Sequence, residues 1–183
     1  EVPELGSRKV LFSREVYIDA SDFEETPPPK YFRMTPGKEV RLKGAYILRC
    51  EGVVRDDAGE IQKVLCTYDP DTKGGNVERK VKGTLHWVSA QEAVDATVRL
   101  YDYLLKEEDD GEDFMERLNP ESLVTLTGCK VEPLLANAQP GDRFQFMRDG
   151  YYVADAQLHA PGQPVFNRIV GLKDGWGKQQ RKG

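Results

Sequence analysis

The feature that most constrains the fold is an apolar pattern of period two, interrupted at short intervals by turn residues. The clearest case runs from Arg143 to Ala154, where RFQFMR is followed by Asp149-Gly150 and then by YYVA. Side chains on a strand alternate between two faces, so we expect Phe144 and Phe146 to face a core and Gln145 to face the other side. Asp-Gly favours a type I′ turn, and the sequence therefore predicts a β-hairpin here.

The same period recurs along the chain and predicts an all-β protein without a long amphipathic helix. Further strands are expected at Lys9–Ile18, Val40–Val54, Ile61–Tyr68, Lys80–Ser89, Ala96–Leu104, Leu123–Thr127 and Pro164–Leu172. Roughly ten or more strands are too many for one minimal barrel, so we expect two consecutive small antiparallel β barrels. We place them at residues 1–90 and 91–183 and leave open a return of the C-terminal strand to the first barrel.

The stretch from Lys30 to Cys50 adds a chemical signal, because it holds six basic residues and a single acid, Glu39. Even positions from Val40 to Leu48 are apolar or small, so Arg41 and Lys43 are expected to share the outer face of one strand. A cationic strand face suits phosphates or base edges. An ordinary solvated outer face is an equal alternative at this point.

The charge and the hydropathy of the chain argue against several classes of function. The net charge of −5 argues against unspecific nucleic-acid binding by the whole surface. Much of the acid lies between Lys106 and Arg117, which we interpret as a solvated, flexible insertion rather than a calcium loop. No apolar run approaches the roughly 18 residues of a membrane span, and no apolar signal segment opens the chain. Because the chain starts at Glu1 and enters a patterned segment almost at once, we expect a fragment of a longer protein.

The residues that usually carry catalysis or bind metals form no recognisable motif. Cys50, Cys66 and Cys129 match no metal spacing or disulfide framework, which fits a reducing cytoplasm, and the first two are expected to be buried. His86 and His159 stand in unrelated contexts without a triad motif, and no glycine-rich phosphate loop is present. We therefore predict a binding module with no catalytic residue and no metal ligand.

Several longer stretches together resemble one known family. In order, they are GKEVRLKGAYILRCEG, CTYDPDT, VKGTLHWVSA, VRLYDYLL, NPESL and PVFNRIVGLKDGW, within a region from about Leu5 to Trp176. They resemble the C-terminal anticodon-binding region of bacterial glutaminyl-tRNA synthetase. The archaeal and eukaryotic type of glutamyl-tRNA synthetase shares this all-β region and is the alternative. The resemblance implies two consecutive antiparallel β barrels that bind the tRNA anticodon loop.

The resemblance also implies a larger parent protein. Its N-terminal Rossmann domain, absent from this chain, would join glutamine to tRNA(Gln) with ATP and Mg²⁺. This chain alone should then aminoacylate nothing and need no cofactor. Its expected partners are tRNA(Gln) and its own catalytic domain, in a cytoplasmic monomer that binds neither membrane nor DNA.

Four candidate contacts that the resemblance implies lie in the basic stretch. Arg33 stands where the family has an arginine that reads the third anticodon base, and Arg41 where an arginine contacts the first base. Lys43 occupies a nearby position that is often arginine. Lys30 stands where one family member has glutamine, and Phe32 where it has lysine, so the contacts at these two positions stay open. For Phe32, stacking on a base and packing in the core are both open.

Two further candidates lie in the hairpin. Gln145 and Arg148 match a Gln-x-x-Arg pattern whose glutamine reads the middle uridine, and a neutral glutamine can both donate to and accept from that base. Arg148 lies beside the predicted turn, where simple solvation is the alternative.

Two other functions stay open. In one, the region relays anticodon engagement to the catalytic domain through aromatic contacts from Trp87, Phe166 and Trp176. In the other, which has little support, a barrel encloses a small ligand.

Overall fold

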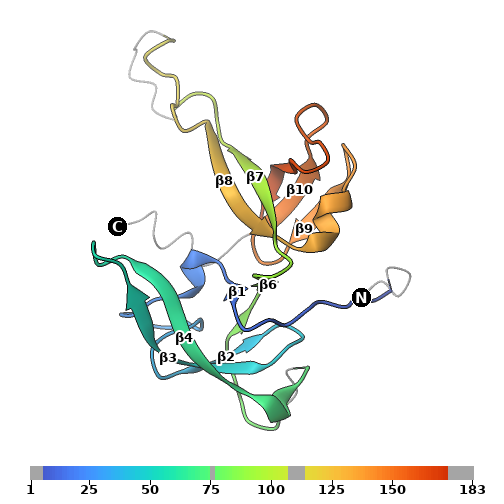
Figure 1. Ribbon diagram of the computed structural model, residues 1–183. Helices are drawn as coiled ribbons and strands as arrows, with labels where there is room; N and C mark the ends of the chain where they lie inside the picture. Colours follow the sequence, from blue (N-terminus) through green and yellow to red (C-terminus); the bar gives the residue numbers. More distant parts are fainter. Residues whose placement is uncertain (1–5, 75–76, 107–113, 173–183) are drawn as a thin grey trace. The chain divides into compact units, whose positions relative to one another are not determined.

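The computed structural model describes residues 6–74, 77–106 and 114–172, and the chain divides into two compact units, Glu1–Gln91 and Glu92–Gly183 (Figure 1). The described residues form strands and three short 3-10 helices, with no α-helix among them. The prediction of an all-β protein is confirmed. The centre of the acidic insertion, residues 107–113, and Trp176 lie outside the described residues.

The first unit contains a four-stranded sheet with the order β4-β3-β2-β5 and a two-stranded sheet of β1 and β6. Its elements are β1 (Val16–Tyr17), η2 (Ala20–Asp22), β2 (Glu39–Leu42), β3 (Ile47–Arg55), β4 (Ile61–Asp69), η3 (Pro70–Thr72), β5 (Thr84–Leu85) and β6 (Val88–Ser89). β3 and β4, which lie almost entirely within two of the predicted strands, form a hairpin across residues 56–60 and are the longest antiparallel pair of this unit. β5 pairs with β2 in parallel, contrary to the purely antiparallel prediction.

Two predicted strands of this unit are shorter than the pattern indicated. Of Lys9–Ile18, only Val16–Tyr17 forms a strand, because its partner β6 offers only two residues to pair with. Lys80–Ser89 is not one strand but two, since the chain leaves the large sheet after Leu85 and joins β1 from Val88. The predicted alternation survives this break: Leu85 and Trp87 are buried, whereas His86 is only partly buried.

The basic stretch is also broken, because a tight turn separates β2 from β3. Ala45 N–H donates to Leu42 O at 3.0 Å. Gly44 has a φ of 69°, a left-handed conformation that glycine adopts without steric cost. Lys43 therefore lies in the turn just after β2, and not within a strand as predicted. Within β2 the alternation holds, since Val40 and Leu42 are buried and Arg41 is not.

The core of the first unit lies on the inner face of the four-stranded sheet and is closed by aromatic rings. Phe12 packs against Tyr46 and Trp87, with ring centroids 4.9 Å and 5.4 Å away. Trp87 is only 7% exposed and belongs to this core, so the prediction that it contacts another domain was wrong. Cys50 is buried as expected, whereas Cys66 on the edge strand β4 is exposed, contrary to prediction.

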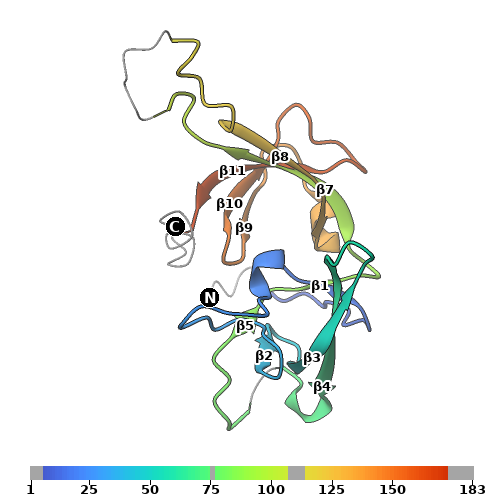
Figure 2. The same cartoon turned by 90° about the vertical axis from the view of Figure 1, so that its left-hand side faces the viewer.

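The second unit is a five-stranded sheet with the order β8-β7-β11-β10-β9, in which Figure 2 shows β9, β10 and β11 side by side. Its elements are β7 (Val94–Tyr101), β8 (Leu123–Val131), η4 (Pro133–Asn137), β9 (Arg143–Phe146), β10 (Gly150–Ala154) and β11 (Val165–Gly171). β11, the last strand described, pairs with β10 and, in parallel, with β7. This second parallel pairing also departs from the antiparallel prediction.

The hairpin of β9 and β10 is confirmed, but its turn differs from the expected one. Asp149 N–H donates to Phe146 O at 3.1 Å, and the residue with positive φ is Arg148, at 66°. Arg148 is the third residue of the turn from Phe146 to Asp149, and a positive φ at this position is typical of a type II turn. Gly150 instead opens β10, where a Cβ would lie 2.6 Å from Val170 O. The glycine is required by close packing of two strands rather than by a type I′ turn.

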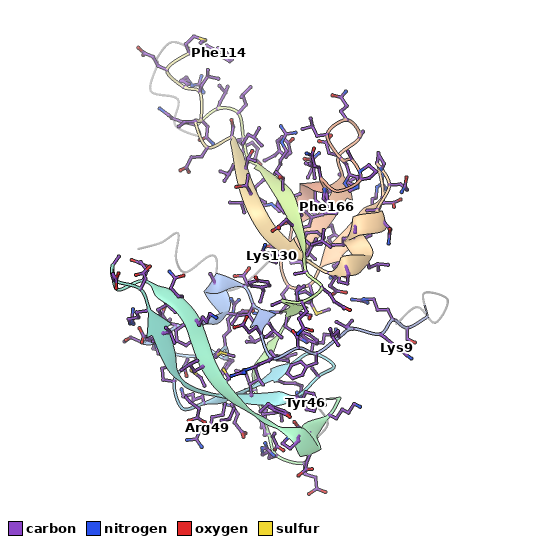
Figure 3. The ribbon with its side chains drawn as sticks, in the orientation of Figure 1. Lys9, Tyr46, Arg49, Phe114, Lys130 and Phe166 are labelled. Atoms are coloured by element: carbon purple, nitrogen blue, oxygen red, sulfur yellow. The ribbon has the colours of Figure 1, made fainter. Side chains whose placement is uncertain are left out.

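The core of the second unit confirms the predicted face of β9. Phe144 and Phe146 pack against buried Phe166, with centroids 5.8 Å and 5.5 Å away, while Gln145 is exposed. Phe166 is 0% exposed and lies inside this unit (Figure 3), so its predicted role in an interdomain contact was wrong. His159 is also a core residue: its Nε2 lies 2.9 Å from Ala138 O and its Nδ1 accepts from Val165 N–H at 3.2 Å.

Asp155 ties the end of β10 to the neighbouring strands. Its carboxylate accepts hydrogen bonds from Asn167 Nδ2 at 2.7 Å and from the N–H groups of Gln157 and Leu158, each at 2.8 Å. Arg99 on β7 lies 3.4 Å away. These contacts lower the pKa of Asp155 to about 2, and the hydrogen bond from Asn167 has the largest effect.

We therefore predict that Asp155 makes the second unit sensitive to acid. A carboxyl whose folded pKa is lowered stabilises the fold above its ordinary pKa of about 3.9, and this stabilisation disappears as the pH falls toward 2. Asp155→Asn should lower the free energy of unfolding at pH 7 and flatten its dependence on pH between about 4 and 2. Denaturant titrations of both proteins across this range provide the test, and parallel pH profiles would contradict it.

Candidate nucleic-acid interface

The loop before β2 is held to η2 by Arg33. Its Nη1 lies 3.1 Å from Asp22 Oδ1, and the two side chains are only 11% and 5% exposed. The same nitrogen donates to Ser21 O at 3.1 Å and to Ser21 Oγ at 3.0 Å. Met34 N–H donates to Asp22 O at 2.9 Å. Arg33 is thus a largely buried, anchored guanidinium and not a solvated surface charge.

Lys30 and Arg148 share an unusual backbone conformation. They are the two residues other than glycine with positive φ in the described part of the chain, at 67° and 66°. Lys30 follows Pro29, and Tyr31 N–H donates to Pro28 O at 3.3 Å, the arrangement of a type II turn. A positive φ costs an ordinary side chain about 1 kcal/mol or more and is found more often at functional sites.

Arg41 and Lys43 are positioned by the segment that contains β5. Arg41 N–H donates to Gly83 O at 2.9 Å, and Lys43 N–H donates to Leu85 O at 3.0 Å. Lys43 O accepts a hydrogen bond from Trp87 Nε1 at 3.0 Å. The turn is therefore held rigidly at its base, while the side chain of Lys43 is exposed.

Phe32 lies against the same segment. A Cβ on Gly83 would come within 2.5 Å of Phe32 O, so only glycine allows this approach. The Phe32 ring is 50% exposed and belongs to neither core, and Lys82 Nζ lies 4.9 Å from its centroid. Core packing, one of the two alternatives for Phe32, is therefore wrong. An exposed ring beside a cation is a surface on which a nucleobase can stack.

The charges around β2 leave this side cationic. Glu39, the only acid of the basic stretch, is bound by Arg79, whose Nε and Nη2 lie 3.0 Å and 3.1 Å from its carboxylate oxygens. Arg49 points away from β3 (Figure 3), and its side chain is 59% exposed and lies 3.7 Å from Glu51, so it is an ordinary surface charge. The carboxylate of Glu39 is thus partly neutralised beside Arg41.

In the second unit, Gln145 and Arg148 lie three residues apart on β9 and its turn. Gln145 is exposed on the outer face, opposite Tyr151 of β10. Arg148 is partly buried. The structure thus places both at one end of the hairpin, and places Lys30, Arg33, Arg41 and Lys43 in the first unit.

No group of three or more histidine, cysteine or acidic residues in the described ranges is arranged to hold a metal ion. Among the same residues, no helix is long and apolar enough to cross a membrane.

Comparison with known proteins identifies the family to which the chain belongs. A family model described as the anticodon-binding domain of class I (E and Q) tRNA synthetases matches residues 1–69, and a second model with the same description matches residues 84–155. The chain belongs to this family. The first match lies within the first unit, and the second lies mostly in the second unit, although it begins at residue 84.

Curated proteins that are similar in sequence to the chain include several glutamine–tRNA ligases, in agreement with this family. The chain is 52% identical over 181 residues to a glutamine–tRNA ligase of Ectopseudomonas mendocina, covering 96% of this chain and 33% of the relative. It is 50% identical to that of Pseudomonas aeruginosa strain LESB58, with the same coverage. The chain thus spans about a third of the length of these relatives and corresponds to the anticodon-binding region of the glutamine–tRNA ligases.

Within this anticodon-binding chain, sequence reasoning missed the residues that position the candidates. Nothing in the sequence marked Asp22 as the partner of Arg33, or Gly83 as the neighbour of Phe32. Lys82 and Arg79 belong to a visible basic run, ERKVKG, which is the one signal that could have pointed to them.

We predict that the pair of Arg33 and Asp22 is structurally important. Asp22→Ala leaves a largely buried guanidinium without its carboxylate, which should lower the free energy of unfolding of the first unit by about 3 kcal/mol. Asp57→Ala, at an exposed position in the turn between β3 and β4, is the matched control and should have little effect. Denaturant titration measures both, and equal stabilities would contradict the prediction.

Proposed function

We propose that this chain binds the anticodon loop of tRNA(Gln) as the C-terminal part of a glutamine–tRNA ligase. The observation that carries the proposal is the match of both units, in order, to anticodon-binding domains. The identity of about 50% to proteins named glutamine–tRNA ligase supports glutamine rather than glutamate as the amino acid. It therefore argues against the glutamyl-tRNA synthetase alternative.

In the first unit, we assign the bases to the side chains that the β2 turn and the preceding loop present. Arg41 and Lys43 would contact the first anticodon base, and Arg33 the third. A guanidinium offers a planar fork of donors, whereas the ammonium of Lys43 is a point charge and discriminates less. Arg33 Nη1 is engaged by Asp22 and Ser21, so its role in reading would depend on other donors of the same guanidinium.

The remaining candidates would support these contacts. Lys30 would meet the RNA backbone from its exposed turn, and Phe32 would offer a stacking face. In the second unit, Gln145 would read the middle uridine, because its amide can donate and accept on that base's mixed edge. Arg148 would contact a phosphate close to it.

The same assignment has consequences for the fold of each unit and for the rest of the longer protein. We propose that each unit curls into a small β barrel, and that a catalytic domain in the remaining two-thirds of the protein uses ATP and Mg²⁺ to attach glutamine. The chain itself would need no cofactor. A cytoplasmic monomer that binds neither DNA nor membrane is consistent with this role.

Gln145→Ala tests the reading of the middle base. Binding of the chain to tRNA(Gln) and to a transcript with cytidine in place of the middle uridine is measured by fluorescence titration at one fixed salt concentration. Unmodified chain should prefer the uridine, and the variant should lose roughly 1–3 kcal/mol of this preference. Undiminished preference would remove Gln145 from the proposed readers.

Gln163→Ala provides the control for this experiment. Gln163 is also an exposed glutamine of the second unit, and its backbone, not its side chain, pairs with Ala160. Its replacement should change neither affinity nor preference. Raising the salt concentration should weaken binding of every protein to a similar degree, since the phosphate contacts are retained.

A further inference from the structure

Three sulfur atoms meet in the first unit, and one of them belongs to Met34, the residue that follows Arg33. Cys50 on β3 and Cys66 on β4 are directly paired across the two antiparallel strands, so their side chains lie on the same face. Cys66 Sγ lies 3.8 Å from Met34 Sδ. Met34 and Cys50 both belong to the buried core of this unit.

The backbone brings the two cysteines close. Cys50 N–H donates to Lys38 O and Cys50 O accepts from Gly37 N–H, so both groups point toward β2 and away from β4. Cys50 and Cys66 therefore form a non-hydrogen-bonded pair, in which the two Cα atoms are only about 4.5 Å apart. Both thiols are free of any disulfide.

The spacing suits a small soft metal ion. Three sulfur ligands around an ion, with metal–sulfur distances of about 2.3 Å, are separated from one another by about 4 Å. The 3.8 Å between Cys66 Sγ and Met34 Sδ agrees with this value. Two thiols and a thioether are soft donors that favour Cu(I). Cys66 is exposed on an edge strand and gives the ion a way in, while buried Cys50 and Met34 close the inner side.

We propose that Met34, Cys50 and Cys66 form a binding site for Cu(I). The ion binds both cysteine sulfurs as thiolates and the methionine sulfur as a neutral thioether. Two protons leave to solvent, and no electron is transferred.

Competition with the chromophoric Cu(I) ligand bicinchoninate tests the proposal, under anaerobic conditions and with thiols kept reduced. The chain should withdraw one Cu(I) per molecule. Cys66→Ser, at an exposed position, and Met34→Leu, which conserves volume, should each weaken the affinity by at least about tenfold. Cys50→Ala should do the same.

Cys129→Ser is the matched control. Cys129 lies on β8 of the second unit, so its replacement should leave the affinity for Cu(I) unchanged. Failure of the chain to compete with bicinchoninate would overturn the proposal. Equal affinity of the Cys66→Ser variant and the unmodified chain would overturn it as well, even if Cys50→Ala failed to fold.

Discussion

The parallel contact between β2 and residues 83–87 is the constraint on which the first unit's candidate interface depends. Its hydrogen bonds to Arg41 and Lys43, and that of Trp87 to Lys43 O, hold the turn after β2 from one side. Gly83 lets the chain approach Phe32 more closely than any side chain would allow. One short segment thus fixes the backbone of three neighbouring candidate residues while their side chains stay accessible or partly accessible.

Rigid presentation of this kind suits recognition of single-stranded bases. An anticodon loop gains specificity only if the donors that meet its base edges are already in place, because ordering them on binding would cost conformational entropy. The anchoring of Arg33 by Asp22 and the left-handed backbone of Lys30 and Arg148 both indicate such preorganisation. The fold holds these residues in costly or constrained arrangements before any RNA is present.

The strands and their faces could be predicted from the sequence where the period-two pattern and the turn residues agreed. The β3–β4 and β9–β10 hairpins followed from alternation together with turn residues, and the opposite faces of Phe144 and Gln145 followed from alternation alone. The pattern failed where long-range pairing decided the outcome. Lys80–Ser89 reads as one strand, yet the chain changes sheets within it, and a parallel partner such as β5 leaves no local trace in the sequence.

The turn types and the buried partners of charged residues were also difficult to predict, because contacts distant in the sequence determine them. Asp149-Gly150 looked like a type I′ turn because its glycine is the residue that such turns use, but Gly150 is needed for its close approach to Val170 O. Gly44 sits within an otherwise regular alternation and breaks it. Asp22 pairs with Arg33 eleven residues later in a loop without periodicity, so only the three-dimensional structure reveals it.

The central claim is that this chain distinguishes one anticodon from another. Its most direct test is the affinity of the unmodified chain for tRNA(Gln) and for the same tRNA with a different anticodon, at equal salt concentration. We predict that the altered tRNA binds at least about fivefold more weakly, the lower limit expected for the loss of one base contact. Equal affinity for both tRNAs would contradict the account.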